Sequence, residues 1–135
     1  MSYSLFLIRF EHGEAAVMDG ALFDEVIGPC VVKREPEHGF VLVRAADGGE
    51  ADIYARTSGT ESGLTSVMIS YFSPGLVLDV IARLAQQLEA AVVLQEGVAL
   101  VHTSGRLEDL PEDLRSDAEV VNLTGTAIQV AIDRV

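Results

Sequence analysis

The sequence has little sulfur, few aromatic side chains and few cations. Its single cysteine, Cys30, excludes a disulfide within the chain and is typical of a reducing compartment, so we expect a cytoplasmic protein. Tryptophan is absent and aromatic residues make up 6% of the chain, so aliphatic side chains must form most of the core. The apolar run at residues 5–8 is too short for a signal peptide, and no stretch approaches the ~20 apolar residues of a membrane span.

Motifs of common catalytic and cofactor sites are also missing. The chain has no CxxC, HxH or HExxH pattern for a metal, no GxSxG around a nucleophile, and no GxGxxG or GK[ST] for a nucleotide. These absences predict no catalytic residues, no metal and no cofactor, and they favour a protein that is not an enzyme.

Positive charge is scarce: nine Lys and Arg stand against 21 Asp and Glu, which gives a net charge of −12. Such a charge repels phosphate backbones and anionic lipid surfaces, so we expect neither nucleic acid nor membrane as a partner. A basic protein partner would be attracted. The alternative interpretation is that the charge only keeps the protein soluble.

What the chain does contain is material for one folded domain. Its length of 135 residues suits one domain, and a hydrophobic fraction of 49% is enough for a core. Together with the predicted strands and helices, this gives a single α+β domain over residues 1–135. The segment at residues 64–94 organises it, because it predicts a strand (64–72), a helix (74–89) and a second strand (91–94). Apolar residues in the helix recur at helical spacing and form one stripe that packs on a sheet. Ser73 is the expected N-cap, with Pro74 at the first helical position.

The other predicted elements surround this unit. Strands are expected at residues 3–10, 30–34, 40–45, 51–56, 98–102 and 119–123, and helices at 20–27, 107–115 and from Thr126 onwards. Asp19 is the expected N-cap of the 20–27 helix, and Thr126 with Gln129 has the spacing of a capping box. Four successive strands favour a mostly antiparallel meander with helices mainly on one face, and apolar residues on both faces of 3–10 predict an interior strand. A ferredoxin-like arrangement is the competing topology.

Several isolated residues are candidates for chemistry, and each has a simpler explanation. Cys30 is expected to be a small buried hydrophobic residue. His12, His38 and His102 are expected at the surface, because they lie in predicted turns or at the end of a predicted strand, and no two of them have the spacing of metal ligands. The acidic run at residues 47–52 fits turn chemistry better than a calcium loop.

The densest charge feature is an acidic segment near the C-terminus. It reads LEDLPEDLRSDAE and contains six carboxylates: Glu108, Asp109, Glu112, Asp113, Asp117 and Glu119. The functional interpretation is a docking surface for a basic protein. The alternative is a solvated face, which is what most runs of charge are.

In size, charge and lack of catalytic motifs, the chain resembles the small acidic immunity proteins of bacterial toxin systems. The resemblance depends on the net charge of −12, the acidic segment and the α+β pattern, without a shared motif. It implies a non-catalytic protein that neutralises a toxin by placing acidic side chains against a basic active site.

Three hypotheses follow from the sequence. The leading one is a non-catalytic acidic binding protein that docks a basic partner through the acidic segment. The alternative is a small enzyme or ligand-binding domain with a pocket under the loop at residues 57–63, which is rich in glycine and hydroxyl groups and is expected to be mobile. The third is a self-associating structural protein that forms a homo-oligomer.

Overall fold

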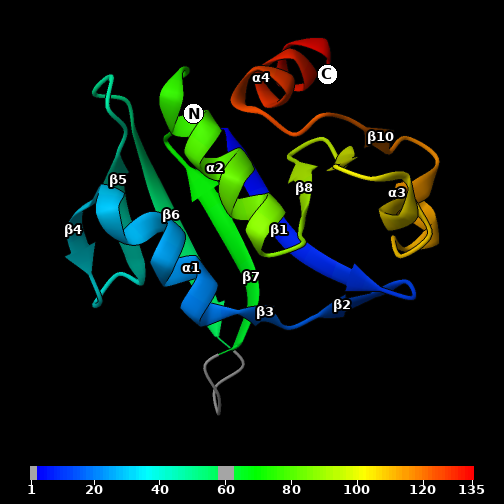
Figure 1. Ribbon diagram of the computed structural model, residues 1–135, viewed down its shortest axis with the longest axis horizontal. Coiled ribbons are helices and arrows are strands. Elements are labelled where there is room, and N and C mark those ends of the chain that lie inside the picture. The colour runs from blue at the N-terminus through cyan, green and yellow to red at the C-terminus, as the bar shows by residue number, and fades with distance from the viewer. Residues whose placement is uncertain (1–2, 58–62) are drawn as a thin grey trace.

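The first strand of the chain lies in the middle of the sheet. In the computed structural model, which describes residues 3–57 and 63–135, β1 (Ser4–Glu11) pairs with β7 (Gly63–Ser70) on one side and β8 (Ala91–Leu94) on the other. Both pairings are antiparallel, and Figure 1 shows β1 running between the two strands. The predicted interior position is therefore confirmed.

The described strands follow the order β10-β9-β8-β1-β7-β6-β5-β4. The predicted antiparallel meander is confirmed from β4 to β7, whereas β10 is parallel to β9. The pairing of β4 with β5 shifts register between Val31 and Lys33, which places a bulge in this edge strand. The remaining bounds are Val31–Glu35 for β4, Phe40–Arg44 for β5, Glu50–Thr57 for β6, Ala99–Val101 for β9 and Glu119–Val120 for β10.

Two short strands have no counterpart among the predicted elements. β2 (Glu14–Ala16) forms a hairpin with β1, and β3 (Met18–Asp19) pairs with β7. The hairpin turns at His12 and Gly13, which both have positive φ. Strands of two or three residues are too short to give an alternating pattern, so the sequence carries no periodic signal for them.

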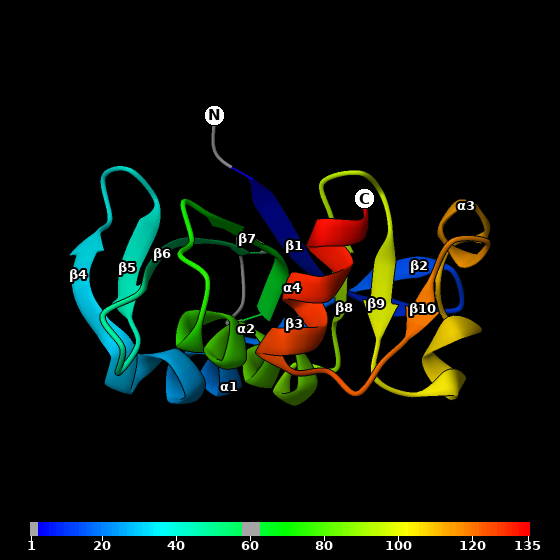
Figure 2. The same ribbon diagram turned by 90° about the horizontal axis from the view of Figure 1, so that it is seen from above.

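Three helices share one face of the sheet, as predicted. α1 (Gly20–Ile27) has the predicted bounds, α2 (Leu76–Gln87) packs against it, and α4 (Gly125–Arg134) packs against α2. Figure 2 shows α1 and α2 side by side along this face. The main core forms here from fully buried side chains of the sheet and helices, among them Leu5, Leu7, Val67, Ile69, Ile81, Leu84 and Ile128.

A second, smaller core lies on the opposite face. In β1 the side chains of Ile8 and Phe10 alternate with Leu7, so they point away from the main core. Leu110, which is 1% exposed, packs against Phe10, Ala99 and Val101. The chain between β9 and β10 supplies this cover; it contains the 3-10 turn η2 (Ser104–Leu107) and the short helix α3 (Glu112–Arg115).

The start of α2 differs from the prediction. The helix begins at Leu76, two residues later than expected, and Ser73 does not cap it; its N-cap is Gly75, with φ of 106°. The cap is supplied by Asp47 from the turn between β5 and β6, whose Oδ2 accepts a hydrogen bond from Leu76 N at 3.1 Å. A Cβ on Gly75 would lie 2.5 Å from that oxygen, so only glycine fits this junction.

The chain after α2 returns to the sheet as β8 and later forms α4. β8 is not adjacent to β7, because β1 fills the place between them. α4 is capped by Thr124, whose Oγ1 accepts a hydrogen bond from Ala127 N at 3.1 Å, and not by Thr126 with Gln129. Asp79 on α2 accepts a hydrogen bond from Gly125 N at 2.8 Å, which fixes α4 against α2. None of the helices in the described residues is long and apolar enough to cross a membrane.

The Asp47 cap gives a pH-dependent prediction. Hydrogen bonds from the backbone N–H groups of Gly49 and Leu76 lower the pKa of the Asp47 carboxyl below its usual 3.8. Because the carboxyl of Asp47 has a lower pKa in the folded protein than in the unfolded chain, it stabilises the fold above pH 3.8. This contribution is lost as the pH falls through the pKa of Asp47 in the folded protein. We expect Asp47→Asn to lower the melting temperature at neutral pH by roughly 2–5 °C and the difference to narrow in acid.

Thermal unfolding followed by circular dichroism, from neutral pH downward, measures this effect. Glu37→Gln is the matched control, because Glu37 is an exposed turn carboxylate. An equal loss in both variants, or a loss that stays constant with pH, would contradict the capping role.

Candidate functional site

The acidic segment lies at the end of the sheet formed by β9 and β10, as Figure 2 shows. It starts after η2, includes α3 and ends in β10. Leu110 and, in part, Leu107 and Leu114 anchor it in the second core. Its backbone is therefore held by burial of apolar side chains, while most of the carboxylates of the segment are exposed.

Two of the six predicted docking residues are engaged within the protein. The Oδ1 atom of Asp109 accepts a hydrogen bond from His12 N at 3.2 Å, and its main-chain oxygen accepts one from Gly13 N at 2.9 Å. Glu119 forms an ion pair with Arg134 of α4. These two carboxylates help to position the segment, and their predicted role in docking a partner stays a prediction.

The other four carboxylates remain available. Glu108, Glu112, Asp113 and Asp117 are exposed and form no ion pair within residues 3–57 and 63–135. We call Glu108, Glu112, Asp113 and Asp117 the free acidic set.

A network of ion pairs ties the segment to the body of the protein. Arg106 reaches Glu89, which follows α2, at 2.9 Å and Asp109 at 3.6 Å. Arg9 of β1 pairs with Glu11 and approaches the same Glu89 at 3.9 Å. The two arginine side chains are only 26% and 23% exposed, so water screens these pairs less than it screens surface pairs.

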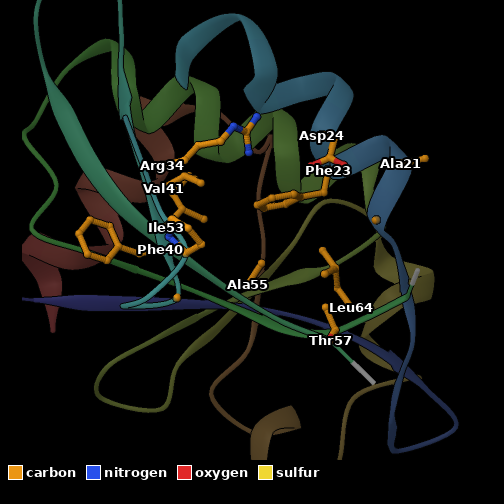
Figure 3. Close-up of a pocket in the computed structure, with 13 residues that line it drawn as sticks. Ala21, Phe23, Asp24, Arg34, Phe40, Val41, Ile53, Ala55, Thr57 and Leu64 are labelled. Atoms are coloured by element: carbon orange, nitrogen blue, oxygen red, sulfur yellow. The ribbon is translucent and has the colours of Figure 1, made fainter. Parts of the chain in front are cut away.

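A cavity of about 560 Å³ opens between α1 and the strands β4 to β7. Figure 3 shows Phe23 reaching from α1 toward Val41, Ile53 and Leu64 of the sheet. The walls are mainly apolar, and the volume falls within the roughly 300–1,000 Å³ of typical ligand pockets. Its lining includes Thr57 and Leu64, which flank residues 58–62. Of the predicted loop at residues 57–63, Thr57 lines this cavity, while residues 58–62, with Ser58, Thr60 and Ser62, lie outside the described residues. The predicted ligand pocket under that loop stays a prediction.

Three polar side chains lie at this cavity: Asp24 of α1, Arg34 of β4 and Thr57 of β6. Arg34 is opposite Val41 in the ladder, and Val41 is opposite Ile53, so Arg34 points to the helix-covered face of the sheet. Asp24 and Arg34 form no ion pair with each other or with another described residue.

The neighbouring charges of β4 satisfy one another. Lys33 pairs with Glu35 at 2.7 Å; this raises the pKa of Lys33 and lowers the pKa of Glu35. Arg34 lies between them and points to the other face, so it does not share in that pair.

A second concavity of about 410 Å³ lies on the opposite face of β6 and β7. Its lining includes Phe6, Tyr54, Arg56 and Met68, which the prediction of a single pocket near residues 57–63 did not include.

The remaining sequence candidates do not form a site. Cys30 is half-buried against the main core, so it is less buried than predicted. His12 and His38 are exposed as predicted, but His102 is half-buried with Nδ1 enclosed and without a partner in the part of the chain that the structure describes. Within those same residues, no three His, Cys, Asp or Glu side chains gather in a way that could hold a metal.

The acidic run at residues 47–52 is used in the fold. Asp47 holds the turn by accepting a hydrogen bond from Gly49 N at 2.9 Å, and Glu50 pairs with Arg44. Burial raises the pKa of the Asp52 carboxyl, and the nearby charge of Glu50 raises it further. The predicted turn chemistry is confirmed.

No family model, curated protein or solved structure matches this chain. The function therefore has to be argued from the two surfaces described above.

The ion-pair network predicts that Arg106 holds the acidic segment in place. Arg106→Gln should lower the free energy of unfolding by about 1 kcal/mol, because two pairs of a partly buried arginine are lost. Amide hydrogen exchange across residues 107–118 should become faster. Arg83→Gln is the matched control, since Arg83 is exposed on α2 and forms no ion pair in the described chain. Equal effects of the two substitutions would contradict the anchoring role.

Proposed function

We propose that this protein is a non-catalytic acidic binding protein that docks a basic protein partner through the free acidic set. The observation that carries the proposal is that the carboxylates of the acidic segment differ in whether they bond within the protein. Asp109 and Glu119 are bonded internally and fix the backbone, while Glu108, Glu112, Asp113 and Asp117 are exposed without ionic partners in the described chain. Binding then requires little ordering of the segment, and ordering is a main cost of association.

The charge of the whole molecule supports the same proposal. A net charge of −12 draws a basic partner towards the protein, and the local cluster orients it. An immunity-type role, in which the segment covers the basic active site of a toxin, is the specific form that we propose. The single cysteine favours a cytoplasmic location for this role.

The test uses two variants with the same net charge. Glu112→Lys with Asp113→Lys reverses two residues of the free acidic set, and Glu25→Lys with Glu37→Lys reverses two exposed carboxylates elsewhere. The partner is first captured from the source cell and identified, and its association rate is then measured by surface plasmon resonance. We expect the first pair of substitutions to slow association on the order of tenfold and the second to have a smaller effect.

Salt gives an independent arm of the same experiment. Association of the wild-type protein should slow steeply as salt rises, because screening removes electrostatic steering. Capture of no partner, binding that is indifferent to salt, or equal slowing by both pairs of substitutions would each count against docking by this segment. Circular dichroism shows whether each variant keeps its fold.

The cavity supports a second candidate function, that of a small ligand-binding domain. The specific observation is a mainly apolar volume of about 560 Å³ with Asp24, Arg34 and Thr57 at its polar positions. Such a combination of apolar walls and a few polar groups is typical of small-molecule sites.

Binding of the neutral fluorescent probe N-phenyl-1-naphthylamine tests this candidate. The probe should bind the wild-type protein, and Ala55→Phe should abolish binding, because Ala55 lines the cavity and the larger ring would fill it. Leu76→Ala is the control, since it alters an exposed apolar side chain on α2, away from this cavity. Equal binding to wild type and Ala55→Phe would show that the probe does not occupy the cavity.

A further inference from the structure

We propose that the cavity between α1 and β4 to β7 binds a molecule with an apolar body and a single carboxylate, and that the carboxylate pairs with Arg34. This inference rests on the second candidate function, a ligand-binding role for the cavity, and it names the ligand class. The argument starts from the charge of Arg34 and its position in the ladder.

Arg34 is a cation without an ionic partner in a protein with excess negative charge. Of the nine Lys and Arg residues, five form ion pairs in the described chain: Arg9, Lys33, Arg44, Arg106 and Arg134. Arg115 donates instead to the main-chain oxygen of Leu110 at 3.0 Å. Arg34, Arg56 and Arg83 are exposed and have neither kind of partner among the described residues, and of these three Arg34 alone lines the cavity.

The register of the sheet directs this cation toward the apolar cavity. Arg34 lies opposite Val41, and both face α1 together with Ile53. The aliphatic part of an arginine side chain packs on apolar surface while its guanidinium stays near water. A ligand in the cavity would therefore contact Phe23 and Ile53 with its body, and its polar end would be at the guanidinium.

The rest of the lining favours one negative charge over several. A guanidinium offers parallel N–H donors that match a carboxylate. Asp24, on the α1 side of the same cavity, disfavours a second negative charge, and so does the net charge of −12. Thr57 adds a hydroxyl that can donate to an oxygen of the ligand. A monocarboxylate with an apolar chain fits this set better than a phosphate ester does.

The experiment compares three molecules that differ only in the head group. Decanoate, decan-1-ol and decylamine compete with N-phenyl-1-naphthylamine at about pH 8, where the acid is ionised and the amine is protonated. The proteins are the wild type, Arg34→Gln and Arg83→Gln, which removes an exposed, unpaired cation outside the cavity.

We expect the wild-type protein to prefer decanoate over decan-1-ol by about threefold to tenfold, as one partly exposed ion pair provides. Arg34→Gln should abolish this preference and leave the affinity for decan-1-ol unchanged, whereas Arg83→Gln should keep it. Arg34→Lys should restore part of it, because the charge returns without the paired donors.

The outcomes distinguish failure of the ligand-binding role from failure of the inference that a carboxylate pairs with Arg34. If none of the compounds, including the neutral probe, binds in the cavity, both the ligand-binding role and the inference fail. If decan-1-ol binds as tightly as decanoate to the wild type, or if Arg34→Gln keeps the preference, the inference fails while the ligand-binding role stands. Tightest binding of decylamine would assign the polar contact to Asp24 and would also overturn the inference.

Discussion

The fold depends on one constraint: β1 must be paired along both of its edges. α2 carries the chain from β7 to β8 and leaves the width of one strand between them, and β1 fills that place with antiparallel ladders to each. Leu5 and Leu7 then become fully buried under the helices, while Ile8 and Phe10 support the second core. The cavity and the acidic segment lie on opposite sides of this central strand, so each has its own part of the sheet as support.

Elements whose bounds depend on neighbouring residues in the chain were predicted best. α1 has its predicted bounds because its cap, Asp19, directly precedes the helix and the apolar spacing lies within residues 20–27. β8 has its predicted bounds because a short apolar run marks residues 91–94. The start of α2 was predicted wrongly, since its cap comes from Asp47, 29 residues earlier in the chain. Two exposed residues of α2 also bond to distant parts of the chain: Asp79 accepts a hydrogen bond from Gly125 N, and Gln86 Nε2 donates to the main-chain oxygen of Leu123 at 2.6 Å.

For the candidate sites too, the sequence did not show contacts between residues that are far apart in the chain. The sequence identified the acidic segment, but it did not show that Asp109 and Glu119 form bonds within the protein. Arg34 could not be recognised from the sequence, because its importance arises only when β4 joins β5 and turns that side chain toward α1. Spacing along the chain indicates which residues share an element, whereas strand order decides which elements meet.

The ends of the sheet affect how the protein behaves at high concentration. A long, flat border strand offers unpaired backbone groups to another chain and can begin a growing fibril. Here one border, β4, is interrupted by the register shift beside Val32, and the other, β10, has only two residues. Neither border therefore gives the long, regular row of unpaired backbone groups on which strands of other chains add most readily.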